Sequence, residues 1–334
     1  MAETKQKSKK SVDPGERQLG LDLYRQMKLI RSFEESVQRL FQKGEVHGTT
    51  HLYSGQEASA VGVCSSLEER DKVAGTYRGH GHSIAKGVDP KALMAEMLGR
   101  VDGVCGGRAG SMNVIDLEHG LIGCFGIIGG SIAAATGAAL TARTVDDGSV
   151  AVAFFGDGTT HQGYYAECLN FAQVEKLPVV FVCENNLYME FTPIEDVTAG
   201  VLGDRPRALG IPTDQVDGND VWAVREAMSK AAEHARSGQG PAFLETMTYR
   251  FVGHSRSDPG KYRKPGELDA WKERDPLILA RQTLESRLGV PAEEVDEVDA
   301  DVADEIESIV EFALASPFPD PGEPAREFKE ASDV

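Results

Sequence analysis

Two apolar runs decide the fold of this chain: Val150-Ala-Val-Ala-Phe-Phe155, which is followed by Gly156-Asp157-Gly158, and Val179-Val-Phe-Val-Cys183, which is followed by Glu184-Asn185-Asn186. Continuous apolar runs of this kind are typical of strands that are buried on both faces of a parallel sheet. The residues between the two runs carry a helical pattern. The stretch therefore predicts a strand, a crossover helix and a second strand parallel to the first.

The flanking sequence adds helices and one more strand. Apolar residues at helical spacing predict a long helix over 16–43 and shorter helices over 56–67 and 90–99. Helices with acidic faces are expected over 269–316, and a further buried strand is expected at 242–249. Together these elements predict an α/β fold, with an open, mostly parallel sheet flanked by helices.

The domain organisation follows from length and composition. The chain has 334 residues without an internal repeat, so we expect one domain over 19–316. Residues 1–18 are expected to form a flexible tail, and the Pro-rich residues 317–334 a C-terminal tail. The start, Met1 to Ser11, lacks the apolar segment of a secretory signal.

The charge and cysteine content exclude several classes of function. The net charge is −18, from 53 acidic and 35 basic residues, so we expect no nucleic-acid partner. Anionic membranes would repel such a chain, and no run is long and apolar enough for a membrane helix. The five cysteines are scattered and form no C-x-x-C pair, which fits a reducing cytosol and predicts a cytoplasmic protein.

Oxygen-bearing side chains follow both strands of the central unit. Asp157 comes directly after the first strand, and Asn186 stands 29 positions later, after the second. The carboxyl ends of parallel strands share one edge of the sheet, where ligands of open α/β sheets bind. Magnesium takes one or two protein oxygens together with phosphate oxygens and water. We therefore expect a magnesium-bound diphosphate at this edge, next to the N-terminus of the following helix.

Each motif also has a simpler interpretation. Gly-Asp-Gly after a strand is often only a turn, and Asn-Asn is common in loops. A nucleotide-binding α/β protein without catalysis remains an alternative, although neither a G-x-G-x-x-G after the first strand nor a Walker motif supports it. The pairing of the two motifs on consecutive strand ends is what makes a ligand site specific.

At this point the sequence resembles a known family. Gly156-Asp157-Gly158 followed by Asn185-Asn186 is similar to the thiamine-diphosphate signature. Over roughly residues 19 to 280 the chain resembles the alpha subunits of the first components of pyruvate, branched-chain 2-oxo-acid and acetoin dehydrogenases. The motifs that carry this narrower resemblance are His51-Leu-Tyr-Ser-Gly-Gln-Glu-Ala58, Thr76-Tyr-Arg-Gly-His-Gly-His82, Gly110-Ser-Met112, Gly126-Ile-Ile-Gly-Gly130 and Gly253-His-Ser-Arg-Ser-Asp-Pro-Gly260.

The resemblance implies a cofactor site position by position. It assigns magnesium to the side chains of Asp157 and Asn186 and to the backbone carbonyl of Tyr188. An arginine at a diphosphate is physically reasonable, because its planar fork matches phosphate oxygens. The residues that the resemblance places around the diphosphate are Tyr77, Arg78, Gly158 and Thr159.

Four further positions complete the implied site. Gly126 and Ile128 stand where the family contacts the aminopyrimidine ring and supports the bent cofactor. His51 and His254 match histidines at the active-site entrance, and we assign both a catalytic role, with His254 also contacting the cofactor. His80 and His82 form an H-x-H that fits a metal pair less well than a phosphate loop.

The resemblance also implies substrates and partners. Thiamine diphosphate supplies the carbanion and electron-sink chemistry. A 2-oxo acid such as pyruvate would be decarboxylated and its acyl group passed to the lipoyl group of a separate acyltransferase; the alternative is cleavage of acetoin, and branched-chain 2-oxo acids come third. The family's activating glutamate resides on a beta subunit, so we expect an α2β2 heterotetramer.

Several positions depart from the family pattern and leave the substrate open. Phe125 stands where a polar residue is common, and Thr160 and His161 belong to a replaced Ala-Ala-Asn. Leu187 belongs to a bulkier segment after the Asn pair. In animal relatives serines of the 254–263 loop are phosphorylated; Ser255 and Ser257 match in context, but the resemblance does not imply that regulation here.

Overall fold

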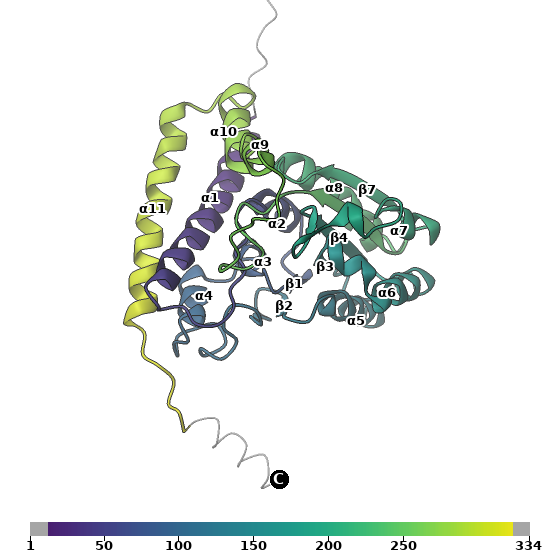
Figure 1. Ribbon diagram of the computed structural model, residues 1–334. Coiled ribbons are helices and arrows are strands. Elements are labelled where there is room, and N and C mark those ends of the chain that lie inside the picture. The colour runs from purple at the N-terminus through teal and green to yellow at the C-terminus, as the bar shows by residue number, and fades with distance from the viewer. Residues whose placement is uncertain (1–12, 323–334) are drawn as a thin grey trace, which may run out of the picture.

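The computed structural model describes residues 13–322, so the parts of the two predicted tails at 1–12 and 323–334 lie outside it. A six-stranded sheet in the order β2-β1-β3-β4-β8-β7 forms its centre, and every neighbouring pair is parallel (Figure 1). The strands are β1 (Lys72–Thr76), β2 (Leu121–Phe125), β3 (Ala151–Gly156), β4 (Val179–Asn185), β7 (Thr213–Asp217) and β8 (Ala242–Met247). The predicted α/β class with a parallel sheet is confirmed.

Alternate residues of the central strands enter different cores. In β3, Val152 and Phe154 pack into a core that includes residues of α1 (Pro14–Gln42), α2 (Glu57–Cys64) and α8 (Val221–Arg236). Ala153 and Phe155 enter the opposite core, with residues of α5 (Gly130–Val145) and α6 (Gly163–Val174). All four side chains are fully buried, which explains the unbroken apolar run in the sequence.

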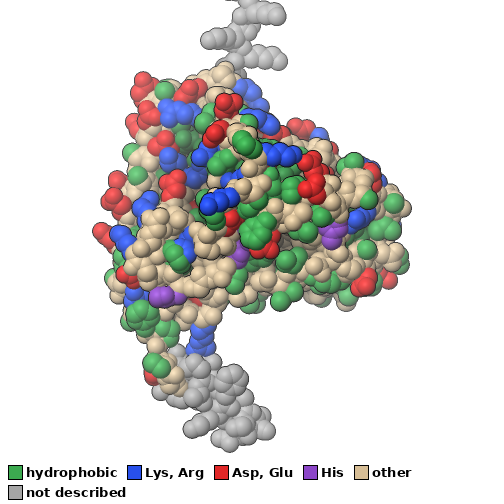
Figure 2. Space-filling model, in the orientation of Figure 1, with side chains coloured by type: hydrophobic (Ala, Val, Ile, Leu, Met, Phe, Trp, Pro, Cys, Tyr) green, Lys and Arg blue, Asp and Glu red, His purple; other side chains and the backbone are tan. Residues whose placement is uncertain are grey.

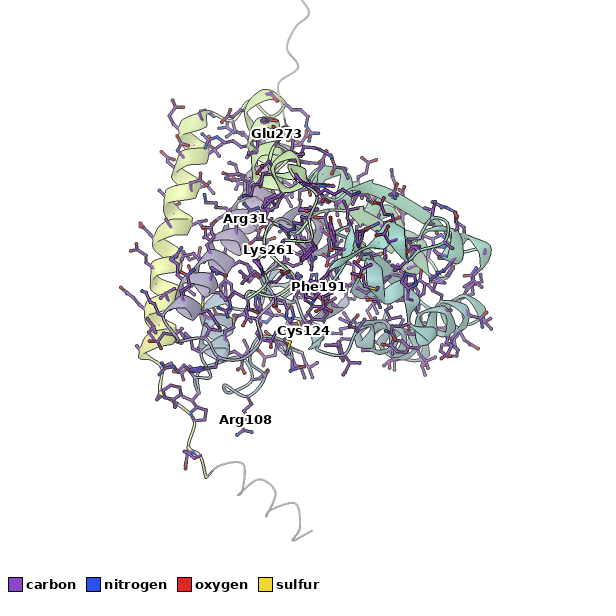
Figure 3. All side chains as sticks on the ribbon, in the orientation of Figure 1. Arg31, Arg108, Cys124, Phe191, Lys261 and Glu273 are labelled. Carbon is purple, nitrogen blue, oxygen red and sulfur yellow. The ribbon has the colours of Figure 1, made fainter. Side chains whose placement is uncertain are left out.

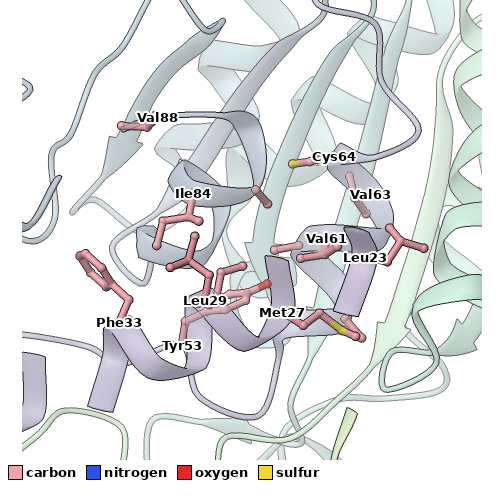
Figure 4. Close-up of a cluster of buried hydrophobic side chains, with 14 of the residues drawn as sticks. Leu23, Met27, Leu29, Phe33, Tyr53, Val61, Val63, Cys64, Ile84 and Val88 are labelled. Atoms are coloured by element: carbon pink, nitrogen blue, oxygen red, sulfur yellow. The ribbon is translucent and has the colours of Figure 1, made fainter. Parts of the chain in front are cut away.

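The two faces of the sheet are covered to different depths. On one face α8 lies against β4 and β8, α2 packs on α8, and α1 packs on α2. Figure 4 shows part of this core, where Met27 and Phe33 of α1 meet Tyr53, Val61 and Ile84. On the other face a single layer of α5 and α6 covers the strands.

The remaining helices extend the thicker face. α11 runs beside α1 along the edge of the molecule and presents acidic side chains there (Figures 1 and 2). Ion pairs join the two helices: Arg25 contacts Glu305 at 2.6 Å and Lys28 contacts Asp299 at 3.2 Å. The other helices are α3 (His80–Lys86), α4 (Pro90–Met97), α7 (Asp204–Ala208), α9 (Glu267–Lys272), α10 (Pro276–Ser286) and α11 (Ala292–Ala315).

Aspartate caps set where several helices begin. Asp13 accepts a hydrogen bond from the Gly15 backbone N–H, and Pro14 takes the first helical position of α1. Residues 14–18 therefore belong to the helix rather than to the tail expected over 1–18. At the other end the Pro317 carbonyl accepts a bond from the Val101 N–H at 2.9 Å, so this part of the expected C-terminal tail contacts the domain.

The other predicted bounds are close to those observed. The strand expected at 179–183 continues to Asn185, and the strand expected at 242–249 ends at Met247. The acidic region expected over 269–316 divides into α9, α10 and α11. No helix within residues 13–322 is both long and apolar enough to cross a bilayer.

A partly buried arginine ties three helices together. Arg31 of α1 donates to Glu57, the first residue of α2, at 2.6 Å, and to Asp275, which caps α10, at 2.9 Å (Figure 3). Glu57 is fully buried and also accepts the Gly55 N–H. These bonds fix the segment that leads from α1 into the cavity described next.

Candidate active site

A cavity of about 320 Å³ opens at the carboxyl edge of the sheet. It lies where β1, β3 and β4 end, as expected for a ligand site of an open α/β sheet. The structure brings together here all the residues that the resemblance assigns: His51, Tyr77, Arg78, Gly126, Ile128, Asp157, Gly158, Thr159, Asn186, Tyr188 and His254. Their individual roles stay predictions.

Asp157 forms the floor of the cavity with one oxygen unsatisfied. The residue opens a 3₁₀ turn directly after β3 and is only 2% exposed. Its Oδ1 accepts the Gly158 N–H at 2.8 Å, whereas its buried Oδ2 has no hydrogen-bond partner among the described residues. Burial raises the pKa of this carboxyl to about 6. A buried carboxylate oxygen without a donor suits a cation.

The two asparagines at the end of β4 make different contacts: Asn185 is the last residue of the strand and Asn186 follows it. Asn185 turns away from the cavity: its Nδ2 donates to Glu245 at 2.7 Å, and its Oδ1 accepts the Leu187 N–H. Asn186 lines the cavity and donates from Nδ2 to Gln56 at 3.2 Å. This bond directs the oxygen of the amide away from Gln56. Asp157 and Asn186 thus offer the hard oxygen ligands that magnesium prefers, so the residues present fit the ion.

The chain bends sharply after Asn186. Leu187 has a φ of 72°, a left-handed conformation that is costly for a bulky side chain. Its carbonyl accepts the Ile194 N–H, which closes the segment containing the short strands β5 (Tyr188–Met189) and β6 (Thr192–Pro193). The bend places Tyr188 in the cavity wall.

Arg78 is the cationic residue among those expected at the diphosphate. Arg78 is 5% exposed and donates to two backbone carbonyls, those of Leu52 at 2.5 Å and His254 at 2.7 Å. No described carboxylate forms an ion pair with it. Burial and the nearby Arg250 lower the pKa of Arg78 to about 10, so the guanidinium stays charged at neutral pH and lacks a counter-charge.

The two entrance histidines lie edge to face. The ring centroids of His51 and His254 are 5.1 Å apart, and Tyr77 contacts both rings, at 4.5 Å and 5.9 Å. Burial and then the charge of Arg78 lower the pKa of each histidine to about 3. Both rings are therefore neutral at pH 7.

Two glycine-rich segments shape the rest of the wall. A Cβ on Gly158 would lie 2.5 Å from the Met189 side chain, so only glycine fits beside that residue. Thr159 is buried next to it. Gly126 and Ile128 belong to the second segment, which forms an exposed lip of the cavity: Ile128 is 46% exposed and its neighbour Ile127 is 75% exposed. This lip leaves a large apolar surface in water.

Sequence reasoning missed three buried residues of the cavity wall. Glu184 accepts hydrogen bonds from Tyr53, from Ser59 at 3.1 Å and from His82 at 3.1 Å. Gln56 holds Asn186, and Arg250 contacts His254. Glu184 and Arg250 both follow the apolar part of a strand, so the strand-end rule that selected Asp157 was capable of finding them.

The histidines of the H-x-H motif and the residues that depart from the family pattern each have defined contacts. His80 contacts Glu34 at 3.0 Å while His82 contacts Glu184, so the two imidazoles engage separate carboxylates. Phe125 lines the cavity, whereas Thr160 donates to the Asp157 carbonyl at 2.8 Å. His161 contacts Thr198 outside the cavity. In the 254–263 loop the Ser255 and Ser257 hydroxyls lie 3.2 Å apart.

Comparison with known proteins identifies the class that this fold and cavity define. Residues 25–322 match the dehydrogenase E1 component family. The chain belongs to this family of thiamine-diphosphate-dependent oxidoreductases, which confirms the resemblance and the expected class of enzyme.

Relatives within the family have particular names. The chain is 43% identical over 299 residues to the alpha subunit of acetoin:2,6-dichlorophenolindophenol oxidoreductase of Bacillus subtilis, covering 89% of both chains. It is 43% identical over 310 residues to the subunit of the same name in Cupriavidus necator, covering 92% of this chain and 93% of that one. It is 42% identical over 302 residues to the pyruvate dehydrogenase E1 component subunit alpha of Zymomonas mobilis, covering 90% and 85%.

Proposed function

We propose that this chain is the alpha subunit of a dehydrogenase that decarboxylates pyruvate, or another short 2-oxo acid, and delivers the acyl group to the lipoyl group of an acyltransferase. One observation carries the proposal: a single cavity holds a buried carboxylate oxygen and a buried arginine, and within residues 13–322 the oxygen has no hydrogen-bond partner and the arginine no carboxylate partner. A diphosphate with its magnesium ion satisfies both at once.

The residues divide the work of binding. Asp157, Asn186 and the Tyr188 carbonyl would hold Mg²⁺, while Arg78 and the backbone around Gly158 would hold the diphosphate. Bound thiamine diphosphate supplies a carbanion and an electron sink. The neutral rings of His51 and His254 would orient the substrate by hydrogen bonds, because their low pKa values prevent either from carrying a proton as an acid at pH 7.

A beta subunit is part of the proposal. The named relatives are alpha subunits, and the exposed lip of Ile127 and Ile128 offers an apolar surface beside the cavity. We expect a beta chain to cover that lip, to provide the activating glutamate, and to complete an α2β2 assembly. We also propose a cytoplasmic location, since the five cysteines are free thiols.

Acetoin is the second candidate substrate. Two relatives at 43% identity carry the acetoin name, which favours cleavage of this substrate as much as decarboxylation of pyruvate. The test is reduction of 2,6-dichlorophenolindophenol by the reconstituted alpha–beta pair with pyruvate, acetoin or a branched-chain 2-oxo acid. We expect turnover with one of the first two that requires thiamine diphosphate and Mg²⁺. Full turnover by the alpha chain alone would contradict the proposal.

A further inference from the structure

Three hydrogen bonds hold His254 in place. Its backbone N–H donates to Asp258 Oδ2 at 2.6 Å, and its carbonyl accepts from Arg78 at 2.7 Å. Its ring Nδ1 lies 2.9 Å from Nη1 of Arg250. The ring therefore has a fixed orientation in the cavity wall, and Nε2 is the polar atom left without a partner within residues 13–322.

The chemistry of arginine decides which way the third bond runs. A guanidinium has only donors and remains protonated in proteins. Nδ1 of His254 must then be the acceptor, which leaves the single proton of a neutral imidazole on Nε2. We propose that Arg250 is a positioning residue that fixes His254 as the neutral Nε2–H tautomer, so that His254 donates a hydrogen bond to an oxygen of the bound substrate or cofactor.

Arg250 is itself locked in this position. It is 2% exposed, and its second terminal nitrogen donates to the Glu190 carbonyl at 2.9 Å and contacts the Tyr262 hydroxyl at 3.3 Å. None of the ion pairs among the described residues includes it. Since no carboxylate within residues 13–322 competes for this guanidinium, its Nη1 is available to donate to Nδ1 of His254.

The charges around the ring act in the same direction. Arg78 and Arg250 face it from the ends of β1 and β8, while His51 and Tyr77 are uncharged neighbours. The one acid, Asp258, already accepts from the His254 and Gly260 N–H groups and from Tyr262. Burial and the two arginines lower the pKa of His254 to about 3, which keeps the ring neutral down to acidic pH.

The consequence is a donor that does not depend on pH. A free histidine titrates near 6.5 and exchanges its proton between both nitrogens. Held by Arg250, the His254 ring offers N–H to the cavity from mildly acidic to alkaline pH. This inference rests on the proposed function for the identity of the acceptor oxygen, but the assignment of the proton does not.

The first experiment uses the reconstituted alpha–beta enzyme with thiamine diphosphate, Mg²⁺ and the dye acceptor between pH 5.5 and 8. We expect Arg250→Met to lower kcat/KM about 10-fold at pH 7 and to raise the pKa of His254 above its wild-type value while burial and Arg78 still depress it, whereas Arg250→Lys retains most of the activity. His254→Gln keeps an amide N–H near the Nε2 position, so adding Arg250→Met to it should cost less than 3-fold. A pH profile of Arg250→Met that superposes on the wild-type profile overturns the proposal.

The second experiment needs no turnover. Neutron diffraction of the assembled, deuterium-exchanged wild-type protein locates the ring deuterium directly, and it decides the matter even where Arg250→Met fails to fold. Deuterium on Nε2 with none on Nδ1 supports the proposal, and deuterium on Nδ1 overturns it. If Nε2 carries deuterium but no thiamine-dependent turnover is found, the proposed function fails while the assignment stands.

Discussion

The two halves of the cavity lack opposite partners among residues 13–322. In the acidic half, formed by Asp157, Asn186 and Tyr188, one carboxylate oxygen, Oδ2 of Asp157, has no donor, whereas in the basic half, formed by Arg78, Arg250, His51 and His254, neither arginine pairs with a carboxylate. Burial shifts pKa values toward neutrality in both halves: it raises that of Asp157 and lowers those of Arg78 and the two histidines. Without a ligand, the buried charge in each half is therefore unfavourable. A ligand that carries charges of both signs would give each buried charge a partner.

The largest effect is expected from breaking the acidic half. Asp157→Asn should weaken Mg²⁺-dependent binding of thiamine diphosphate by about 100-fold or more, roughly 3 kcal/mol, measured by calorimetry on the alpha–beta pair. Asp147→Asn, at an exposed aspartate outside the cavity, is the matched control and should change little.

The same substitution should have the opposite effect on the ligand-free chain. A raised folded-state pKa gives stability that is present below the unfolded value of 3.8 and is lost as pH rises through about 6. Asp157→Asn should therefore raise the free energy of unfolding at pH 7 by about 2 kcal/mol. An unchanged cofactor affinity would contradict the role given to the acidic half.

Breaking the basic half should weaken binding less. Arg78→Met removes one charged donor and should raise the Kd for thiamine diphosphate about 10- to 100-fold, roughly 1.5–3 kcal/mol. Arg78→Lys should lie between this variant and the wild type, because an ammonium keeps the charge but loses the fork. Arg207→Met, at an exposed arginine, serves as control in the same titration. Equal affinities of Arg78→Met and the control would remove Arg78 from the site.

The pH dependence of stability separates the halves further. The depressed pKa values of His51 and His254 give stability that is present above the unfolded value of 6.5 and is lost as pH falls toward 3. Relative to a double His→Gln variant at these positions, the wild type should lose about 1 kcal/mol between pH 7 and 5.5, after allowance for solvent screening. Urea unfolding at each pH measures the difference in unfolding free energy between the two proteins. Both contain Asp157, so the pH dependence that this residue contributes cancels in the difference.

The smallest effect concerns the bend between the metal residues. Leu187→Gly relieves a left-handed conformation but adds freedom to the unfolded chain, so the free energy of unfolding should rise by between zero and about 1 kcal/mol. Leu187→Val should instead lower it, because a β-branched side chain is worse at a φ of 72°. Thermal unfolding of the two variants side by side gives the sign, and a more stable valine variant would show that the bend is not strained.

The acidic half was the more predictable from sequence, for a physical reason. Asp157 directly follows β3 and Asn186 directly follows β4, so the parallel sheet alone brings them to one edge. Arg250 of the basic half stands directly after the strand end expected at 249, although β8 already ends at Met247. The strand-end rule was therefore able to find Arg250 as well, but it gives no indication of the contacts that this residue makes.

The sequence did not predict the contacts between loops that lie far apart along the chain. The bonds from Arg78 to the Leu52 and His254 carbonyls join segments that no local pattern connects. The family resemblance supplied Arg78 and His254 as members of the site, but not their mutual contact. The pair Asp13-Pro14 is a typical start of a helix, yet the helix was expected to begin at residue 16, two residues after its observed start at Pro14.

The order of strands in the sheet has a consequence for how the molecule folds. β1 pairs with β2 on one side and with β3 on the other. The cavity is lined by segments far apart in the sequence, from His51 to His254, and these segments meet only after the central strands have paired. Such long-range pairing is slow to form because large loops must close first. No fragment of the chain is then able to recognise the cofactor, and ligand added during refolding should leave the early collapse unaffected while it stabilises only the finished protein.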